Sequence, residues 1–161
     1  MNPRPDRQII VQTYEGAAVS NSIDIDPTPG MIGYARANYP MLLANVKQVG
    51  PPSGRYNCHG LVFGNRRTNI PAAGEDSRGL LQRLLQEDHF ISVDAADVTE
   101  GDIVLWWKGD DAYHSAIVSH VQQAPFRAVL TWSMWGGLGE FVHPIAQTPY
   151  GDCRIDYWRL V

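Results

Sequence analysis

The chain has 161 residues, of which 44% are hydrophobic and 19% charged, and its formal net charge is -4. This composition is typical of a globular protein with a substantial core, and the lack of any Lys/Arg run argues against nucleic acid as a partner. No apolar stretch approaches the roughly 18 residues that a membrane helix needs, so we expect no membrane partner.

Residues 1–50 are the least readable part of the chain, and RQIIVQTY within them is compatible with a short strand. The segment MIGYARANYPMLLANVKQV has helical spacing, and Pro40 should interrupt it because proline breaks a helix interior. GPPSG at residues 50–54 ends this part. The start, MNPRPDRQII, has no apolar segment of the signal-peptide type. We therefore expect a protein that is cytoplasmic as synthesised, with a signal-peptide-independent delivery route left open.

Two helices are predicted after this break. Asn57 is a good N-cap residue and places Cys58 in the first helical turn. SRGLLQRLLQEDHF then has the spacing of an amphipathic helix, with Asp76 or Ser77 as its cap. The apolar stripe of this second helix consists of Leu80, Leu81, Leu84 and Leu85.

Five strands are predicted in the rest of the chain: GDIVLWW, HSAIVSHV, AVLTWSMW, EFVHPI and CRIDYWRL. Each is rich in β-branched or aromatic residues, and Gly, Asp and Pro clusters separate them. Helices followed by antiparallel strands indicate an α+β fold, with N-terminal helices packed on a C-terminal antiparallel sheet of about five strands.

Cys58 is the candidate nucleophile. Two distant cysteines, Cys58 and Cys153, are too few for a disulfide framework, so both are expected to be thiols. A first-turn position favours the reactive thiolate through the helix dipole and free backbone N–H groups. His59 is a poor base for Cys58 because neighbours on a helix do not face each other. His114, at the start of a predicted strand, is therefore the expected base, since His120 lies about 20 Å further along that strand.

The base needs a group that orients its imidazole. A hairpin between HSAIVSHV and AVLTWSMW places Ser133 nearest to His114, with Thr131 and His143 as alternatives. Trp132 and Trp135 straddle Ser133 and are expected to form a cleft wall.

A zinc site is the competing interpretation of the same residue types. Such a site would recruit its ligands from Cys58, His59, His114, His120 and His143. These residues form no C-x-x-C or H-x-x-x-H pair, so we expect neither a metal nor any other cofactor.

The motifs resemble a known family. NCHGLV resembles the DCSGLV helix start of the NlpC family of papain-like cysteine peptidases, TEGDIVLWW its Gly-Asp strand, and HSAIVSHV its catalytic His strand. The resemblance covers residues 54–135, and the CHAP amidases are a more distant alternative with the same order of Cys and His. Asn57, His59 and Ala116 stand where the family usually has Asp, Ser and Gly. The resemblance implies a papain-like domain over residues 1–161, with a catalytic core at 54–161, a Cys nucleophile and a His base.

We therefore expect a cysteine peptidase or amidase that cleaves an amide bond in a peptide or peptidoglycan-like substrate, with Cys58, His114 and Ser133 as catalytic residues. The expected substrate-binding residues are Tyr56, Asn57, Trp132 and Trp135. Two alternatives stay open. One is a deamidase or acyltransferase, delivered as an effector, that modifies side chains of a protein target. The other is a non-catalytic binding module of the same fold, and a protein target or inhibitor is the partner expected beyond the substrate.

Overall fold

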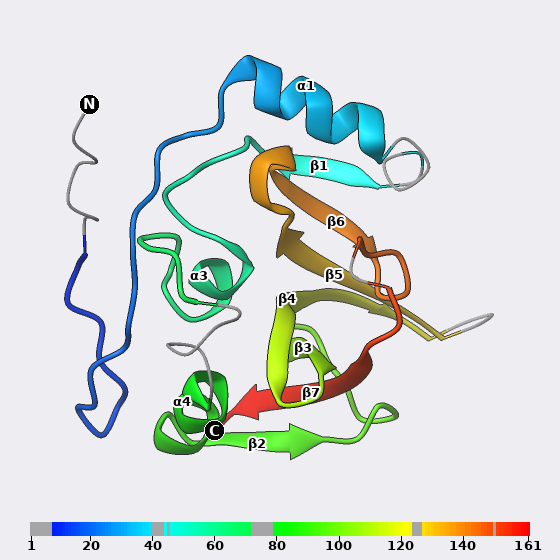
Figure 1. The fold of residues 1–161 in the computed structure, drawn as a ribbon. Helices are drawn as coiled ribbons and strands as arrows, with labels where there is room; N and C mark the ends of the chain where they lie inside the picture. Colours follow the sequence, from blue (N-terminus) through cyan, green and yellow to red (C-terminus); the bar gives the residue numbers. More distant parts are fainter. Residues whose placement is uncertain (1–7, 40–43, 45, 72–78, 124–126, 150) are drawn as a thin grey trace.

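The fold is built around one strongly bent antiparallel sheet with helices beside it (Figure 1). The structure is a computed structural model that describes residues 8–39, 44, 46–71, 79–123, 127–149 and 151–161. The seven strands lie in the order β1-β6-β5-β4-β3-β7-β2. Their bounds are β1 Lys47–Gly50, β2 Phe90–Val93, β3 Ile103–Lys108, β4 Asp111–Gln122, β5 Ala128–Met134, β6 Glu140–Pro144 and β7 Arg154–Leu160.

The α+β prediction is confirmed, but the number of strands is wrong, since the sheet has seven strands and not about five. The five predicted segments are all strands, β3 to β7. The two additional strands, β1 and β2, have four residues each and occupy the two edges of the sheet. Short edge strands are a common way of limiting edge-to-edge association. Strand β1 comes from the poorly readable N-terminal part, which therefore contributes to the sheet.

Three α-helices are described: α1 Pro29–Asn38, α3 Cys58–Val62 and α4 Leu80–Glu87. Helix α1 ends before Pro40, as the sequence predicts, and residues 40–43 lie outside the described residues. The predicted apolar stripe of α4 is confirmed, because its four leucines are buried. The residue before this helix is Gly79, and the predicted caps Asp76 and Ser77 lie outside the described residues. RQIIVQTY contributes only an isolated bridge between Gln12 and Ala18.

The sheet separates two apolar clusters. On one face, Leu105 and Trp107 of β3 pack with the leucines of α4. On the other face, Val104 and Trp106 pack with Ala116 and other residues of β4 and β5. Alternate residues of β3 therefore point to opposite faces, as the two-residue period of a strand requires. Figure 1 shows α3 beside β4, on the same side of the sheet as α4.

Within the described ranges, no helix is both long and apolar enough to cross a membrane.

Candidate functional site around Cys58

Cys58 is the first residue of helix α3, as the sequence predicts. Asn57 is its N-cap, with extended backbone, and the Asn57 side chain accepts a hydrogen bond of 2.8 Å from the backbone N–H of Gly60. The Cys58 thiol is buried, because only 6% of the residue is exposed. Helix α3, which begins with this cysteine, packs directly on β4.

The Asn57 side chain also ties the start of α3 to residue 70. Its Oδ1 accepts from the Ile70 N–H at 3.1 Å, and its Nδ2 donates to the Ile70 carbonyl at 2.6 Å. An aspartate has no proton to donate to that carbonyl at neutral pH, so this contact explains why an amide stands at position 57. Asn57 was expected to bind substrate, but these hydrogen bonds commit much of its side chain to the protein itself.

Gly60 allows the close packing behind Cys58. A Cβ atom at this position would lie 1.8 Å from the backbone oxygen of Thr68. Any larger residue would therefore push α3 away from the turn that follows it. The glycine of NCHGLV thus has a steric role that fixes the position of the cysteine.

Ser115 on β4 is the hydrogen-bonding neighbour of the Cys58 sulfur. Burial raises the pKa of the Cys58 thiol, while hydrogen bonds from the Ser115 backbone and hydroxyl act in the opposite direction. The backbone groups of His59 and of Cys58 itself also lower the thiol pKa. Because burial has the larger effect, the resting group is a protonated thiol.

His59 lies on the other side of Ser115. Its Nδ1 is 2.8 Å from the Ser115 hydroxyl, and its Nε2 is 2.8 Å from the carbonyl oxygen of Ala112. A carbonyl only accepts, so Nε2 must carry the proton, and Nδ1 then accepts from the Ser115 hydroxyl. His59 is fully buried, which lowers its pKa to about 4. Cys58, Ser115 and a neutral His59 therefore form a continuous hydrogen-bonded series.

His114 was expected to face Cys58, and the structure corrects this. Strand β4 directs Ser115 toward α3, so the adjacent His114 points to the opposite face of the sheet. There its ring lies 4.9 Å, centroid to centroid, from the Trp106 ring. The physical reason is the register, since His114 pairs with Trp106 and directly opposite residues share one face of the sheet. Burial, followed by the nearby His59 and His143, lowers the pKa of His114 well below its ordinary value.

Ser133 was expected to orient His114, but its hydroxyl lies 2.7 Å from Nε2 of His143. The Nδ1 atom of His143 lies 2.9 Å from the Pro144 carbonyl oxygen, and Thr131 is a further neighbour at 3.3 Å from Nε2. Burial lowers the pKa of His143 to about 4. Thr131, Ser133 and His143, which were the alternative candidates for the orienting residue, therefore hydrogen-bond one another in the interior, on the face opposite α3.

Tyr56 and Trp132, two of the expected substrate-binding residues, meet at a carboxylate that sequence reasoning missed. Glu140 accepts hydrogen bonds from the Tyr56 hydroxyl, from Nε of Arg66 at 2.8 Å and from Nε1 of Trp132 at 2.7 Å. The Arg66 guanidinium lies 4.3 Å from the centre of the Trp132 ring. These partners lower the pKa of Glu140, and burial with the Glu140 contact raises that of Tyr56 to about 12.

Trp135 does not join Trp132 in a cleft wall. It is 3% exposed, its ring stacks on Phe141 at 4.8 Å, and it lies 4.6 Å from the His143 ring. Trp135 is therefore a core residue. Within the part of the chain that the structure describes, no three His, Cys, Asp or Glu residues are grouped so that they could hold a metal ion.

Comparison of the chain with protein-family models, with curated proteins and with solved structures finds no match.

Proposed function

We propose that this protein is a thiol-dependent amidase or peptidase, with Cys58 as nucleophile and a peptide or peptidoglycan-like molecule as substrate. The observation that supports the proposal is the series Cys58–Ser115–His59, in which one hydroxyl contacts both the thiol and the imidazole. Nucleophilic catalysis by cysteine needs a base within hydrogen-bond reach, directly or through one mediator.

The proton has a defined route in this arrangement. As the sulfur attacks the amide carbonyl, the thiol proton passes to the Ser115 oxygen, and the Ser115 hydroxyl proton passes to Nδ1 of His59. The serine hydroxyl is regenerated and donates to the sulfur. Because the pKa of His59 is low and that of Cys58 is raised, the resting pair is neutral, and transfer has to accompany attack.

The remaining steps follow ordinary acyl chemistry. The carbon–nitrogen bond breaks, the leaving amine takes the proton back from His59 by the same route, and an acyl-enzyme remains on Cys58. Water then releases the acid. If an amine replaces water, the outcome is acyl transfer, and if the substrate is a side-chain amide, the outcome is deamidation.

A non-catalytic module of the same fold is the second candidate, and a specific observation favours it. Only 6% of Cys58 and none of His59 is exposed. A buried cysteine often serves packing alone. Under this interpretation, Ser115 and His59 only join α3 to β4.

The test is incubation of the purified protein with peptidoglycan and, separately, with a cytosolic protein extract, followed by mass spectrometry of the products. If the proposal is correct, the products show amide cleavage, release of ammonia or acyl transfer. Cys58→Ser abolishes this activity, whereas Cys153→Ser retains it. If products are identical with the native protein and with Cys58→Ser, and a thiol-reactive probe labels Cys58 no faster than in the unfolded chain, the non-catalytic module is the correct function.

A further inference from the structure

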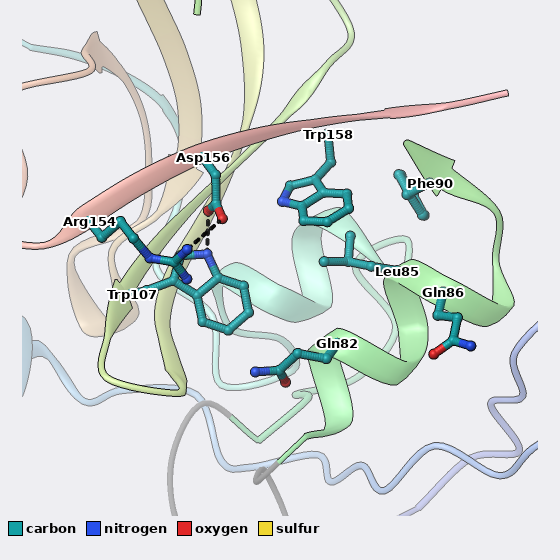
Figure 2. Close-up of a pocket in the computed structure, with 8 residues that line it drawn as sticks. All are labelled: Gln82, Leu85, Gln86, Phe90, Trp107, Arg154, Asp156 and Trp158. Atoms are coloured by element: carbon teal, nitrogen blue, oxygen red, sulfur yellow. Dashed lines mark hydrogen bonds and ion pairs between the residues drawn. The ribbon is translucent and has the colours of Figure 1, made fainter. Parts of the chain in front are cut away.

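A cavity lies on the α4 side of the sheet, between α4 and the strands β3 and β7. Its volume is about 240 Å³. Figure 2 shows its aromatic walls, which are the indole rings of Trp107 and Trp158 and the ring of Phe90. Leu85 closes the apolar side, whereas the exposed Gln82 of α4 borders the opening.

One carboxylate stands among these rings. Asp156 of β7 accepts a hydrogen bond from Nε1 of Trp107. Its side chain is 24% exposed, and burial raises its pKa because the charged form is partly removed from water. A partly desolvated carboxylate among aromatic rings attracts a cation that is itself weakly hydrated.

One cationic side chain of the protein, that of Arg154, already lies at the rim of the cavity. Arg154 lies 3.4 Å from Asp156 Oδ2, and its guanidinium is 5.4 Å from the centre of the Trp107 ring. The Arg154 side chain is 65% exposed, however, and such solvent-exposed ion pairs contribute only about 0–1 kcal/mol. Arg154 therefore shows which chemistry the cavity attracts without occupying it firmly.

We propose that this cavity binds a methylated ammonium group, such as that of choline or of a methylated lysine, between Trp107 and Trp158 with Asp156 as counter-charge. A primary ammonium needs an acceptor for each of its three N–H groups, whereas three of the lining residues are aromatic and the amides of Gln82 and Gln86 lie on the α4 side. A methylated ammonium has fewer or no N–H groups to satisfy and interacts favourably with ring faces. The proposal does not depend on the reactivity of Cys58.

The experiment is a titration of the ¹⁵N-labelled protein with tetramethylammonium and with choline, followed by NMR on the indole N–H signals. Trp107→Phe and Trp158→Phe assign the two signals of interest. At constant ionic strength, we expect saturable shifts of these two signals and smaller changes elsewhere. The neutral isostere 3,3-dimethylbutanol should bind at least fivefold more weakly than choline.

Charge variants make the test specific. Asp156→Asn keeps the shape and should weaken choline binding at least fivefold, while Arg154→Gln should strengthen it by removing the competing cation. Asp94→Asn removes the same charge from an exposed position away from the cavity and should leave binding unchanged. A trimethyl-lysine peptide compared with choline then distinguishes a protein source from a small molecule. Equal binding of the neutral isostere, or no loss in a folded Asp156→Asn, would overturn the proposal.

Discussion

The hydroxyl of Ser115 lies 2.8 Å from Nδ1 of His59, and the same serine hydrogen-bonds the Cys58 sulfur. Cys58 and His59 are sequence neighbours whose side chains diverge on the helix, so they cannot meet directly. One residue of β4 joins them. The candidate chemistry of this chain therefore depends on the packing of α3 on β4.

We predict that Ser115→Ala slows alkylation of Cys58 by iodoacetamide at pH 7.5 by about 10-fold or more. The reason is that a hydrogen bond to a charged group is worth about 1.5–3 kcal/mol, and the variant removes the hydroxyl that favours the thiolate. Peptide mapping by mass spectrometry separates Cys58 from Cys153. Ser119→Ala is the matched control, since Ser119 lies on the same strand and donates only to the Leu130 carbonyl. Equal rates in the two variants would contradict the role of Ser115.

We predict that the two buried histidines next to Ser115 behave differently on substitution. His59→Gln retains a donor for the Ala112 carbonyl but has no basic nitrogen, so it should lower amide turnover by about 100-fold or more. His114→Gln should retain most of the turnover of the folded protein, because β4 directs this side chain toward Trp106. Turnover is compared at equal folded fraction, measured by circular dichroism. If His114→Gln lowered turnover more than His59→Gln, His114 and not His59 would be the base.

The fold was largely predictable where the pattern extends over many residues. In the five longer strands, the β-branched and aromatic residues identify each strand. In α4, the leucines repeat at helical spacing, which identifies the helix. Strands β1 and β2 have four residues each, and KQVG offers a single branched apolar side chain, Val49. Their pairing with β6 and β7 depends on long-range contacts, which no local pattern contains.

The candidate site was predictable at Asn57 and Cys58, because capping is a local interaction. The partner on β4 was not, because the register between β3 and β4 decides which of His114 and Ser115 faces α3. Shifting a strand by one residue exchanges its two faces. Glu140 was missed for a related reason, since two of its partners, Tyr56 and Arg66, lie 84 and 74 residues earlier in the chain.

We predict that Asn57→Asp lowers the free energy of unfolding by about 1–3 kcal/mol at pH 7. The variant replaces the donor to the Ile70 carbonyl by an acceptor, which leaves two oxygens facing each other. The deficit should shrink at pH 4, where a protonated carboxyl can donate. Urea unfolding at the two pH values provides the measurement. Asn38→Asp, which loses a similar bond to the Tyr34 carbonyl at an exposed position, should cost at most about 1 kcal/mol.

We predict that Glu140→Gln destabilises the protein by about 1.5–3 kcal/mol, because the variant loses hydrogen bonds to a charged group while the partly exposed side chain of Arg66 returns to water. Glu140 is 4% exposed and neutralises Arg66, while it also accepts from Tyr56 and Trp132. Glu100→Gln removes an exposed carboxylate that contacts only the exposed His120, and it should cost less than about 1 kcal/mol. Equilibrium unfolding monitored by tryptophan fluorescence compares the two. Similar small losses would mean that the Glu140 cluster does not hold β6 to α3.

We predict that stability falls as the pH is lowered from 7 to 5, before the carboxylates titrate. Burial lowers the pKa of His59 and of His143 from 6.5 to about 4. A lowered histidine pKa means that the unfolded chain takes up protons in this range while the folded chain does not. Each of the two histidines should therefore cost up to about 3 kcal/mol of stability by pH 4, and nothing above pH 7.

The slope of unfolding free energy against pH measures this effect directly, because it equals the difference in bound protons between the two states. His143→Gln keeps an acceptor for the Ser133 hydroxyl and removes a titrating ring, so the slope between pH 7 and 5 should fall by up to one proton. A native slope near zero in this range would mean that His59 and His143 take up protons in the folded state, and the neutral His59 required by the proton route from Cys58 would then be wrong.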